Sequence, residues 1–320
     1  MLCKSDQREM GILLVACTLF VLLVAGEVHG SRSHATGEEV KQKFHAPINE
    51  TSSIRGLIGH VSPHLQDSSD AIVYFAYHGA ASAPNGYYGF IGTMDVYGLP
   101  LAQGQGSAAA VWISDEGDGA PSSLKNIMIG WDVLPDLYGD SKTHFYIKWT
   151  NDGFQSTGCL NLKCNGFQPE KGAAITPGDV IDHVSSPNGA KRNLNLKIIK
   201  NGTSGDWLVH CGLDRPPQLI GRFPRSLFTG GFADRAVGIT FGGVVSAPIT
   251  KPTPMGSGYL PTDVKSAASI SNIQLVDQNG RAWPVTGDLP KLETNRNAYA
   301  VTPIVNGRFY YGGHEQPPMV

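Results

Sequence analysis

The sequence predicts an all-β fold, an antiparallel β-sandwich of two sheets, and three observations support this. Gly and Pro are abundant, with 39 and 21 of 320 residues, which is typical of a chain with many turns. Only 16% of the residues are charged, against roughly 25% in an average globular protein. Helical periodicity is scarce, and no strand–helix–strand rhythm suggests a parallel sheet.

Short apolar runs separated by turn signals predict the individual strands. Residues 193–198 read Asn-Leu-Asn-Leu-Lys-Ile and alternate with period two, as a half-buried strand should. Asn-Gly dipeptides, which favour turns, begin at residues 85, 165, 188 and 279. Residues 226–233 could form one or two helical turns. The predicted strands cover residues 71–78, 107–114, 143–150, 193–200, 207–212, 235–242 and 270–276.

The N-terminus predicts export. Residues 10–26 carry no charge and follow Lys4 and Arg8, a pattern typical of a signal peptide removed after about residue 30. The alternative, a signal anchor, needs about 20 apolar residues, and this run is shorter. We therefore expect a signal peptide at 1–30, a polar linker or remnant propeptide at 31–69 and a compact domain at 70–320, with no stable membrane insertion after cleavage.

Charge argues against nucleic acid as a partner. The formal net charge is −2, and no block of five or more basic residues occurs. Binding to phosphates needs clustered Lys and Arg. The sequence therefore predicts no nucleic-acid interface.

The cysteines and sequons fit an exported protein. Cys159 and Cys164 are separated by four residues in a loop-like stretch, which predicts a disulfide in an oxidising compartment. A zinc half-site is the alternative, although no second cysteine or histidine pair follows at metal spacing. Cys211 is left as an odd thiol on a buried strand. Asn49 and Asn201 each begin an Asn-x-Thr glycosylation sequon.

Familiar catalytic motifs are missing from the sequence. It has no G-x-S-x-G elbow and no H-E-x-x-H helix, so we expect neither metal nor cofactor. Chemistry by two carboxylates needs acids held on rigid strands. Asp95, Asp132 and Asp152 stand near aromatic residues, although a structural role is the simpler expectation for each. The four glutamates of the compact domain lie in turn-like contexts, at Glu116, Glu170, Glu293 and Glu315.

A longer pattern resembles a known family. Residues 130–166 read GWDVLPDLYGDSKTHFYIKWTNDGFQSTGCLNLKCNG, which looks like the central signature of the neprosin domain, a large plant family. The motifs G-D-W-L at 205–208, F-G-G at 241–243, M-G-S-G at 255–258 and Y-Y-G-G at 310–313 agree with the family in order. The resemblance covers roughly residues 70–313.

The resemblance implies a glutamic endopeptidase that cuts beside proline at acidic pH. In such proteins two Glu side chains face each other across a groove in a β-sandwich, without metal or cofactor. The corresponding positions here are Met128 and Val244, so both carboxylates are absent. Asp132 shares strand parity with Met128 but lies roughly 13 Å further along, which makes it a poor replacement.

We therefore expect a secreted, catalytically impaired neprosin-domain protein, in the cell wall or apoplast, whose groove binds proline-containing or extended peptides. One alternative is an active proline-directed endopeptidase that uses Asp132 and Asp152 as displaced carboxylates. Another is a structural cell-wall glycoprotein. Trp131 and Trp149 could instead fill the sandwich core. The candidate groove residues are Trp131, Asp132, Trp149, Asp152, Gly243 and Tyr259.

Overall fold

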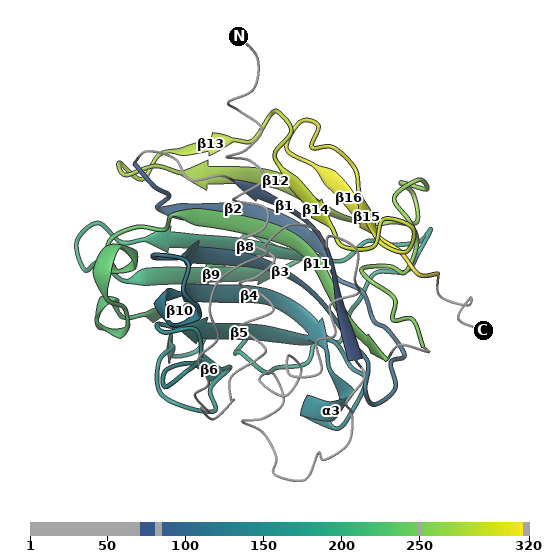
Figure 1. Ribbon diagram of the computed structural model, residues 1–320, viewed down its shortest axis with the longest axis horizontal. Helices are drawn as coiled ribbons and strands as arrows, with labels where there is room; N and C mark the ends of the chain where they lie inside the picture. The colour runs from purple at the N-terminus through teal and green to yellow at the C-terminus, as the bar shows by residue number, and fades with distance from the viewer. Residues whose placement is uncertain (1–70, 81–84, 249–250, 316–320) are drawn as a thin grey trace, which may run out of the picture.

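The computed structural model describes residues 71–80, 85–248 and 251–315, which form two stacked antiparallel sheets with very little helix (Figure 1). The predicted all-β sandwich is confirmed. The signal peptide at 1–30, the linker at 31–69 and the sequon at Asn49 lie outside the described residues and stay predictions.

The first sheet has seven strands in the order β14-β1-β11-β3-β4-β5-β6. Strands β3, β4 and β5 follow one another along the chain, whereas β11 comes from a distant segment and lies between β1 and β3, so the sheet depends on long-range pairing. The strand bounds are β1 (Ala71–Ala80), β3 (Gly106–Asp115), β4 (Lys125–Val133), β5 (His144–Thr150), β6 (Cys159–Leu160), β11 (Gly238–Pro248) and β14 (Lys291–Glu293).

The second sheet has nine strands, eight of them in the order β15-β16-β12-β2-β8-β9-β10-β7, with β13 paired to β12. A short helix, α3 (Pro135–Tyr138), follows β4 of the first sheet. The strands are β2 (Gly89–Asp95), β7 (Gln168–Pro169), β8 (Asn193–Lys200), β9 (Trp207–Leu213), β10 (Gln218–Phe223), β12 (Ala268–Val276), β13 (Ala282–Pro284), β15 (Ala300–Val301) and β16 (Phe309–Gly312).

Each predicted strand overlaps an observed one, and the prediction for β8 has the observed bounds. The largest difference is β11, which begins three residues later than expected and continues to Pro248. The segment expected to form helical turns contains two 3₁₀ turns, Arg225–Leu227 and Gly230–Ala233. Nine of the sixteen strands in the described residues were absent from the predicted set, and the longest of these are β2, β4 and β10.

The main core lies between the two sheets, and β4 shows how the alternation of a strand builds it. Ile127, Ile129 and Trp131 belong to this core, whereas Met128 belongs to a second, smaller apolar cluster on the outer face of the first sheet. The Trp131 indole Nε1–H donates to the backbone oxygen of Asp95 on β2, at 2.9 Å. This hydrogen bond joins the two sheets directly.

Cys159 and Cys164 form a disulfide, so the predicted pairing is confirmed. The bond holds the loop after β5, where β6 contributes only two residues. Cys211 is a free, buried thiol on β9, and burial raises its pKa to about 12. It is therefore an inert core residue rather than a nucleophile.

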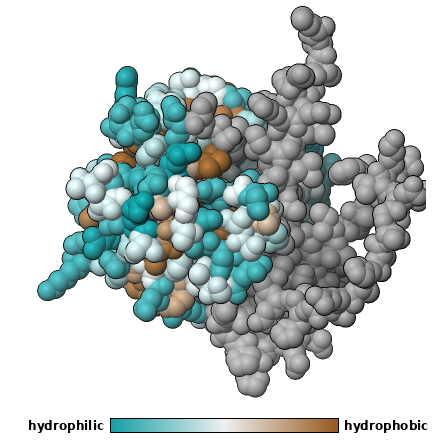
Figure 2. All heavy atoms as spheres, turned by 60° about the vertical axis from the view of Figure 1, so that its left-hand side comes forward, coloured by the Kyte–Doolittle hydropathy of each residue, from teal (hydrophilic) through white to brown (hydrophobic). Residues whose placement is uncertain are grey.

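The outer surface is mainly polar on the face shown in Figure 2, with isolated apolar residues. The exposed large apolar side chains are scattered over the fold, at Leu162, Leu219, Val264, Trp283 and Val305. Single exposed apolar residues are normal for a folded domain. No helix in the part of the chain that the structure describes is long and apolar enough to cross a membrane.

Candidate functional site

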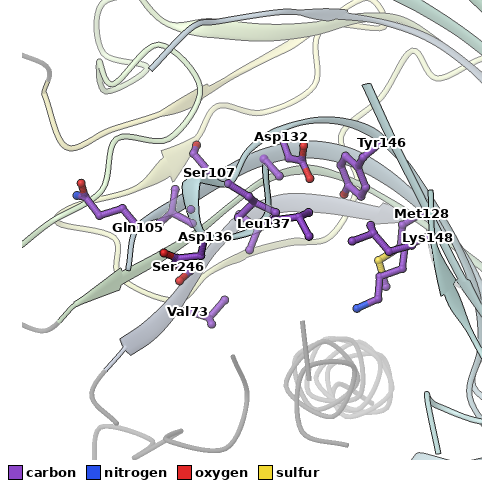
Figure 3. Close-up of a pocket in the computed structure, with 16 residues that line it drawn as sticks. Val73, Gln105, Ser107, Met128, Asp132, Asp136, Leu137, Tyr146, Lys148 and Ser246 are labelled. Atoms are coloured by element: carbon purple, nitrogen blue, oxygen red, sulfur yellow. The ribbon is translucent and has the colours of Figure 1, made fainter. Parts of the chain in front are cut away.

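A partly open groove with a free volume of about 80 Å³ lies on the outer face of the first sheet (Figure 3). Residues of one parity on β4 and β5 point into it, because successive side chains of a strand alternate between faces. The side chains that matter most for its chemistry are Ala108, Met128, Asp132, Tyr146, Lys148 and Val244.

Both positions at which the family resemblance implies a glutamate therefore line the same groove, as Met128 on β4 and Val244 on β11. Strand β3 lies between these two strands. Neither a thioether nor an isopropyl group can exchange a proton with water or an amide. The structure thus brings the two predicted positions to one site without supplying a carboxylate at either.

The strand register places a different residue level with Val244. Ala108 on β3 pairs with Val244 on one side and with Asp132 on the other. Met128 belongs to another row, since it pairs with Trp112, which pairs with Thr240. Asp132 and Val244 are thus separated by two strand spacings, roughly 10 Å between backbones.

This register revises the expectation for Asp132. Along β4, Asp132 lies four residues from Met128, which makes it a poor replacement for a carboxylate at the Met128 position. Measured from Val244, however, it lies directly across one strand. Asp132 is therefore the acid best placed to act with whatever occupies the Val244 position.

Asp132 is held in a dry environment. Its side chain is 1% exposed, and burial raises its pKa well above the usual range, while a hydrogen bond from the Tyr138 hydroxyl opposes that shift. Its Oδ1 has no hydrogen-bond partner among the described residues. Asn161 Nδ2 in turn donates to the Tyr138 hydroxyl at 3.2 Å. Asp132 is thus a carboxyl group that favours its neutral form and has one oxygen free for a ligand.

Lys148 is a second buried ionisable group in the groove. It lies on β5, paired with Met128 on one side and Leu160 on the other, and is 6% exposed. Its Nζ has no hydrogen-bond partner among the described residues and lies 4.1 Å from the centroid of the Phe154 ring. Desolvation lowers the pKa of this amine to about 7. Lys148 therefore carries a charge that nothing in the described structure neutralises.

Replacing Lys148 with Met is expected to stabilise the fold at pH 6 by up to roughly 4 kcal/mol. The folded pKa lies below the unfolded one, so the unfolded chain binds more protons between about pH 7 and 10. Stability of the unmodified protein therefore rises with pH in that window, and the advantage of Lys148→Met shrinks. Urea unfolding at pH 6 and pH 9.5 measures this; a pH-independent difference would contradict it.

Three of the predicted groove residues lie on the wrong face of the sheet. Trp131 and Trp149 belong to the core between the sheets, and an added Cβ at Gly243 would meet the side chain of Met255 at 2.7 Å, on the same inner side. The alternative, that both tryptophans fill the core, is correct. Adjacent strand residues face opposite sides, so Trp131 could not share a face with Asp132.

The other two predicted groove residues lie in loops. Asp152 accepts hydrogen bonds within its own turn, from Thr157 Oγ1 at 2.7 Å and from the backbone N–H of Ser156 at 2.9 Å. Tyr259 follows the M-G-S-G turn and is half-buried. Neither residue lines the groove. Asp152 is therefore a turn-stabilising residue, and its pairing with Asp132 as displaced carboxylates is corrected.

Tyr146 and Lys148 were missed by the sequence reasoning. Their signal was present in strand β5, which reads His-Phe-Tyr-Ile-Lys-Trp-Thr. A lysine alternating with core residues Ile147 and Trp149 must point to the opposite face. In the structure every residue of β5 is buried, on the groove face as well as on the core face.

Two remaining predictions concern sites outside the groove. Asn201 lies in a turn, where its Oδ1 accepts hydrogen bonds from the backbone N–H groups of Thr203 and Ser204; its glycosylation stays a prediction. Within the described ranges, no three His, Cys, Asp or Glu side chains are grouped in a way that could hold a metal ion.

Comparison with known proteins identifies the family. Among solved structures, the chain is similar to a scytalido-glutamic peptidase with a peptide-based transition state analogue, at 8% identity and a TM-score of 0.39, over 76% of this chain and 100% of that one. It is also similar to SCP-B, a member of the eqolisin family of peptidases in complex with the tripeptide Ala-Ile-His, at 8% identity and a TM-score of 0.37, over 77% and 98%. The Neprosin family profile matches residues 103–314, and the chain belongs to the Neprosin family.

Proposed function

We propose that this protein is secreted, acts in the cell wall or apoplast, and binds proline-containing or extended peptides in the groove without efficiently cleaving them. The observation that carries this proposal is the occupancy of the groove: Met128 and Val244 stand where the family resemblance implies a pair of glutamates. The groove itself is open, largely apolar and flanked by a few buried polar groups, which is typical of ligand sites.

Export is supported by the apolar segment at 10–26 and by the disulfide between Cys159 and Cys164. Disulfides persist mainly in oxidising compartments. N-terminal sequencing of protein from the culture medium should find a chain that starts near Ser31.

The proposal is tested by measuring the binding of a labelled proline-containing peptide to the secreted protein at pH 5, by fluorescence anisotropy, with mass spectrometry of the same sample to detect cleavage. Ala108→Trp fills the groove between Asp132 and Val244 and should weaken binding about tenfold or more. Ala190→Trp, at an exposed alanine outside the groove, is the matched control and should bind normally.

Binding that is equal in both variants would place the peptide elsewhere, and absence of binding would favour a structural glycoprotein. Cleavage by the unmodified protein would favour the second candidate, an endopeptidase that uses Asp132. That candidate is supported by one observation, the position of Asp132 level with Val244 across Ala108. Asp132→Asn should then abolish the cleavage.

A further inference from the structure

We propose that Lys148 is the specificity-determining residue of the groove and that it pairs with a carboxylate group of the bound peptide. The proposal rests on the proposed function, since it names the chemistry of the ligand for that same groove. A carboxylate on such a ligand could be the C-terminus or the side chain of an acidic residue, and both have the same chemistry.

The first step is the position of the amine. Lys148 lies in the outer row of the groove, between Met128 on β4 and Leu160 on β6. In Figure 3 its Nζ extends away from the strand, beside Met128. Its flanking neighbours are thus apolar, and Phe154 covers it with a ring face at 4.1 Å.

The second step is the missing partner. Lys148 is 6% exposed, and its Nζ makes no hydrogen bond with any described residue. Lys148 also forms no salt bridge with any of the described residues. A buried cation without a partner destabilises the free protein. An incoming carboxylate would satisfy this amine through short, charge-assisted hydrogen bonds.

The third step concerns the other ionisable groups that face the groove. Asp132 could compete with the ligand as an anion, but burial raises its pKa and favours its neutral form. Tyr146 also remains neutral, because burial and the neighbouring Asp132 raise its pKa well above the usual range. Asp136 is occupied by a hydrogen bond from the backbone N–H of Gly104 at 2.9 Å. That hydrogen bond comes from a neutral amide and cancels no charge, so the groove presents a ligand with one cation, at Lys148, and with one acidic side chain besides Asp132, at Asp136.

The same geometry gives the ligand its orientation. Asp132 has one oxygen without a partner among the described residues. It pairs with His144 on the neighbouring strand β5, and Lys148 lies four residues beyond His144 on that strand. The two groups are therefore roughly 14 Å apart along the sheet. An extended peptide of about four residues spans that distance, with its carboxylate at Lys148 and a backbone amide near Asp132.

The experiment compares three proline-containing peptides with the same core: one with both ends blocked and no acidic residue, one with a free C-terminal carboxylate, and one with blocked ends and a single internal Glu. Calorimetry at pH 6 should show at least one carboxylate peptide binding about tenfold or more tightly than the neutral peptide. Whichever of the two gains affinity identifies the source of the carboxylate.

Matched variants assign the effect to the amine. Lys148→Met should remove the preference, so that the carboxylate peptide and the neutral peptide bind with the same affinity. Lys171→Met, at an exposed lysine outside the groove, should keep the preference. Equal binding of all three peptides to the unmodified protein, or a preference that survives Lys148→Met, would overturn the role of Lys148 and leave the peptide groove standing. Absence of binding to any peptide would overturn both.

The pH dependence supplies a second readout. The preference should weaken as the pH rises above 7, because the amine of the free protein loses its proton there. Lys148→Arg keeps its charge at all these pH values and should abolish this decline. The decline should persist in Asp132→Asn and in Asp136→Asn, which remove the two carboxyl groups that line the groove and could repel a peptide carboxylate. Loss of the decline in either Asn variant, or its persistence in Lys148→Arg, would assign it to a carboxyl group of the groove instead.

Discussion

The variant with both Met128→Glu and Val244→Glu is expected to cleave proline-containing peptides at acidic pH about 10²–10⁴-fold faster than the unmodified protein, which should leave them intact. Both positions line the groove, and neither native side chain can transfer a proton. The register sets these positions two strands and four residues apart, so the two glutamates would act from opposite sides of a bound peptide, as the family resemblance implies. Peptide mass spectrometry over a pH range measures the result.

The single variants separate two routes to activity. Met128→Glu alone should give little cleavage, because groups that act as a unit are strongly non-additive. Val244→Glu alone places a carboxylate level with Asp132 across Ala108, so activity equal to that of the double variant would identify Asp132 as the second acid. Met128→Gln with Val244→Gln is the matched control and should stay inactive. Rapid cleavage by the unmodified protein would contradict the proposed impairment.

Replacing Trp131 with Ala is expected to destabilise the fold by about 5 kcal/mol, at the upper end for a buried aromatic. Trp131 is fully buried between the sheets, so its removal leaves a large cavity. It also removes the indole hydrogen bond to the backbone oxygen of Asp95, at 2.9 Å. Urea unfolding of the disulfide-intact protein measures the loss.

Two further variants divide this effect. Trp131→Phe retains much of the volume but leaves the Asp95 oxygen without its donor, which should cost about 1–3 kcal/mol. Trp283→Ala is the matched control, since Trp283 is 36% exposed on β13, and it should cost less than about 1 kcal/mol. Equal losses for Trp131→Ala and Trp283→Ala would contradict the core position of Trp131.

Local patterns predict several strands, but burial alone does not decide which ones, since β5 is buried throughout and was predicted, whereas the half-exposed β10 was not. β8 was located at its observed bounds because Leu194, Leu196 and Ile198 alternate with polar residues. In β4 almost all residues are buried, on both faces, and the polar residues Lys125, Asn126 and Asp132 interrupt its apolar run. Neither the alternation of a half-buried strand nor the continuous apolar run of a fully covered one is therefore visible in it. Long-range pairing, rather than local sequence, defines such a strand.

The candidate site could be predicted only in part. The family pattern singles out Met128 and Val244, and both residues line one groove. The pattern does not predict the register of the strands. Asp132 and Val244 lie level because each pairs with Ala108, which belongs to a third segment of the chain. The alternation of side chains along β4 places Asp132 on the same face as Met128, and Trp131 on the opposite face. The buried lysine was missed because its environment depends on neighbours from β4 and β6.

The alanines of β3 have a consequence for the shape of the groove. Ala108 and Ala110 point to the groove face, and Ala110 pairs with two glycines, Gly130 on β4 and Gly242 on β11. The surface is therefore low at the centre of the sheet because these residues have small side chains or none. The strands themselves keep their regular pairing. A larger side chain at Ala108 would raise the floor of the groove. A Cβ at Gly130 or Gly242 would instead lie 1.9 Å or 2.5 Å from a backbone oxygen of the neighbouring strand, so these two positions must stay small. Relatives built on the same ladder can thus differ in the size of ligand they admit without any change of fold.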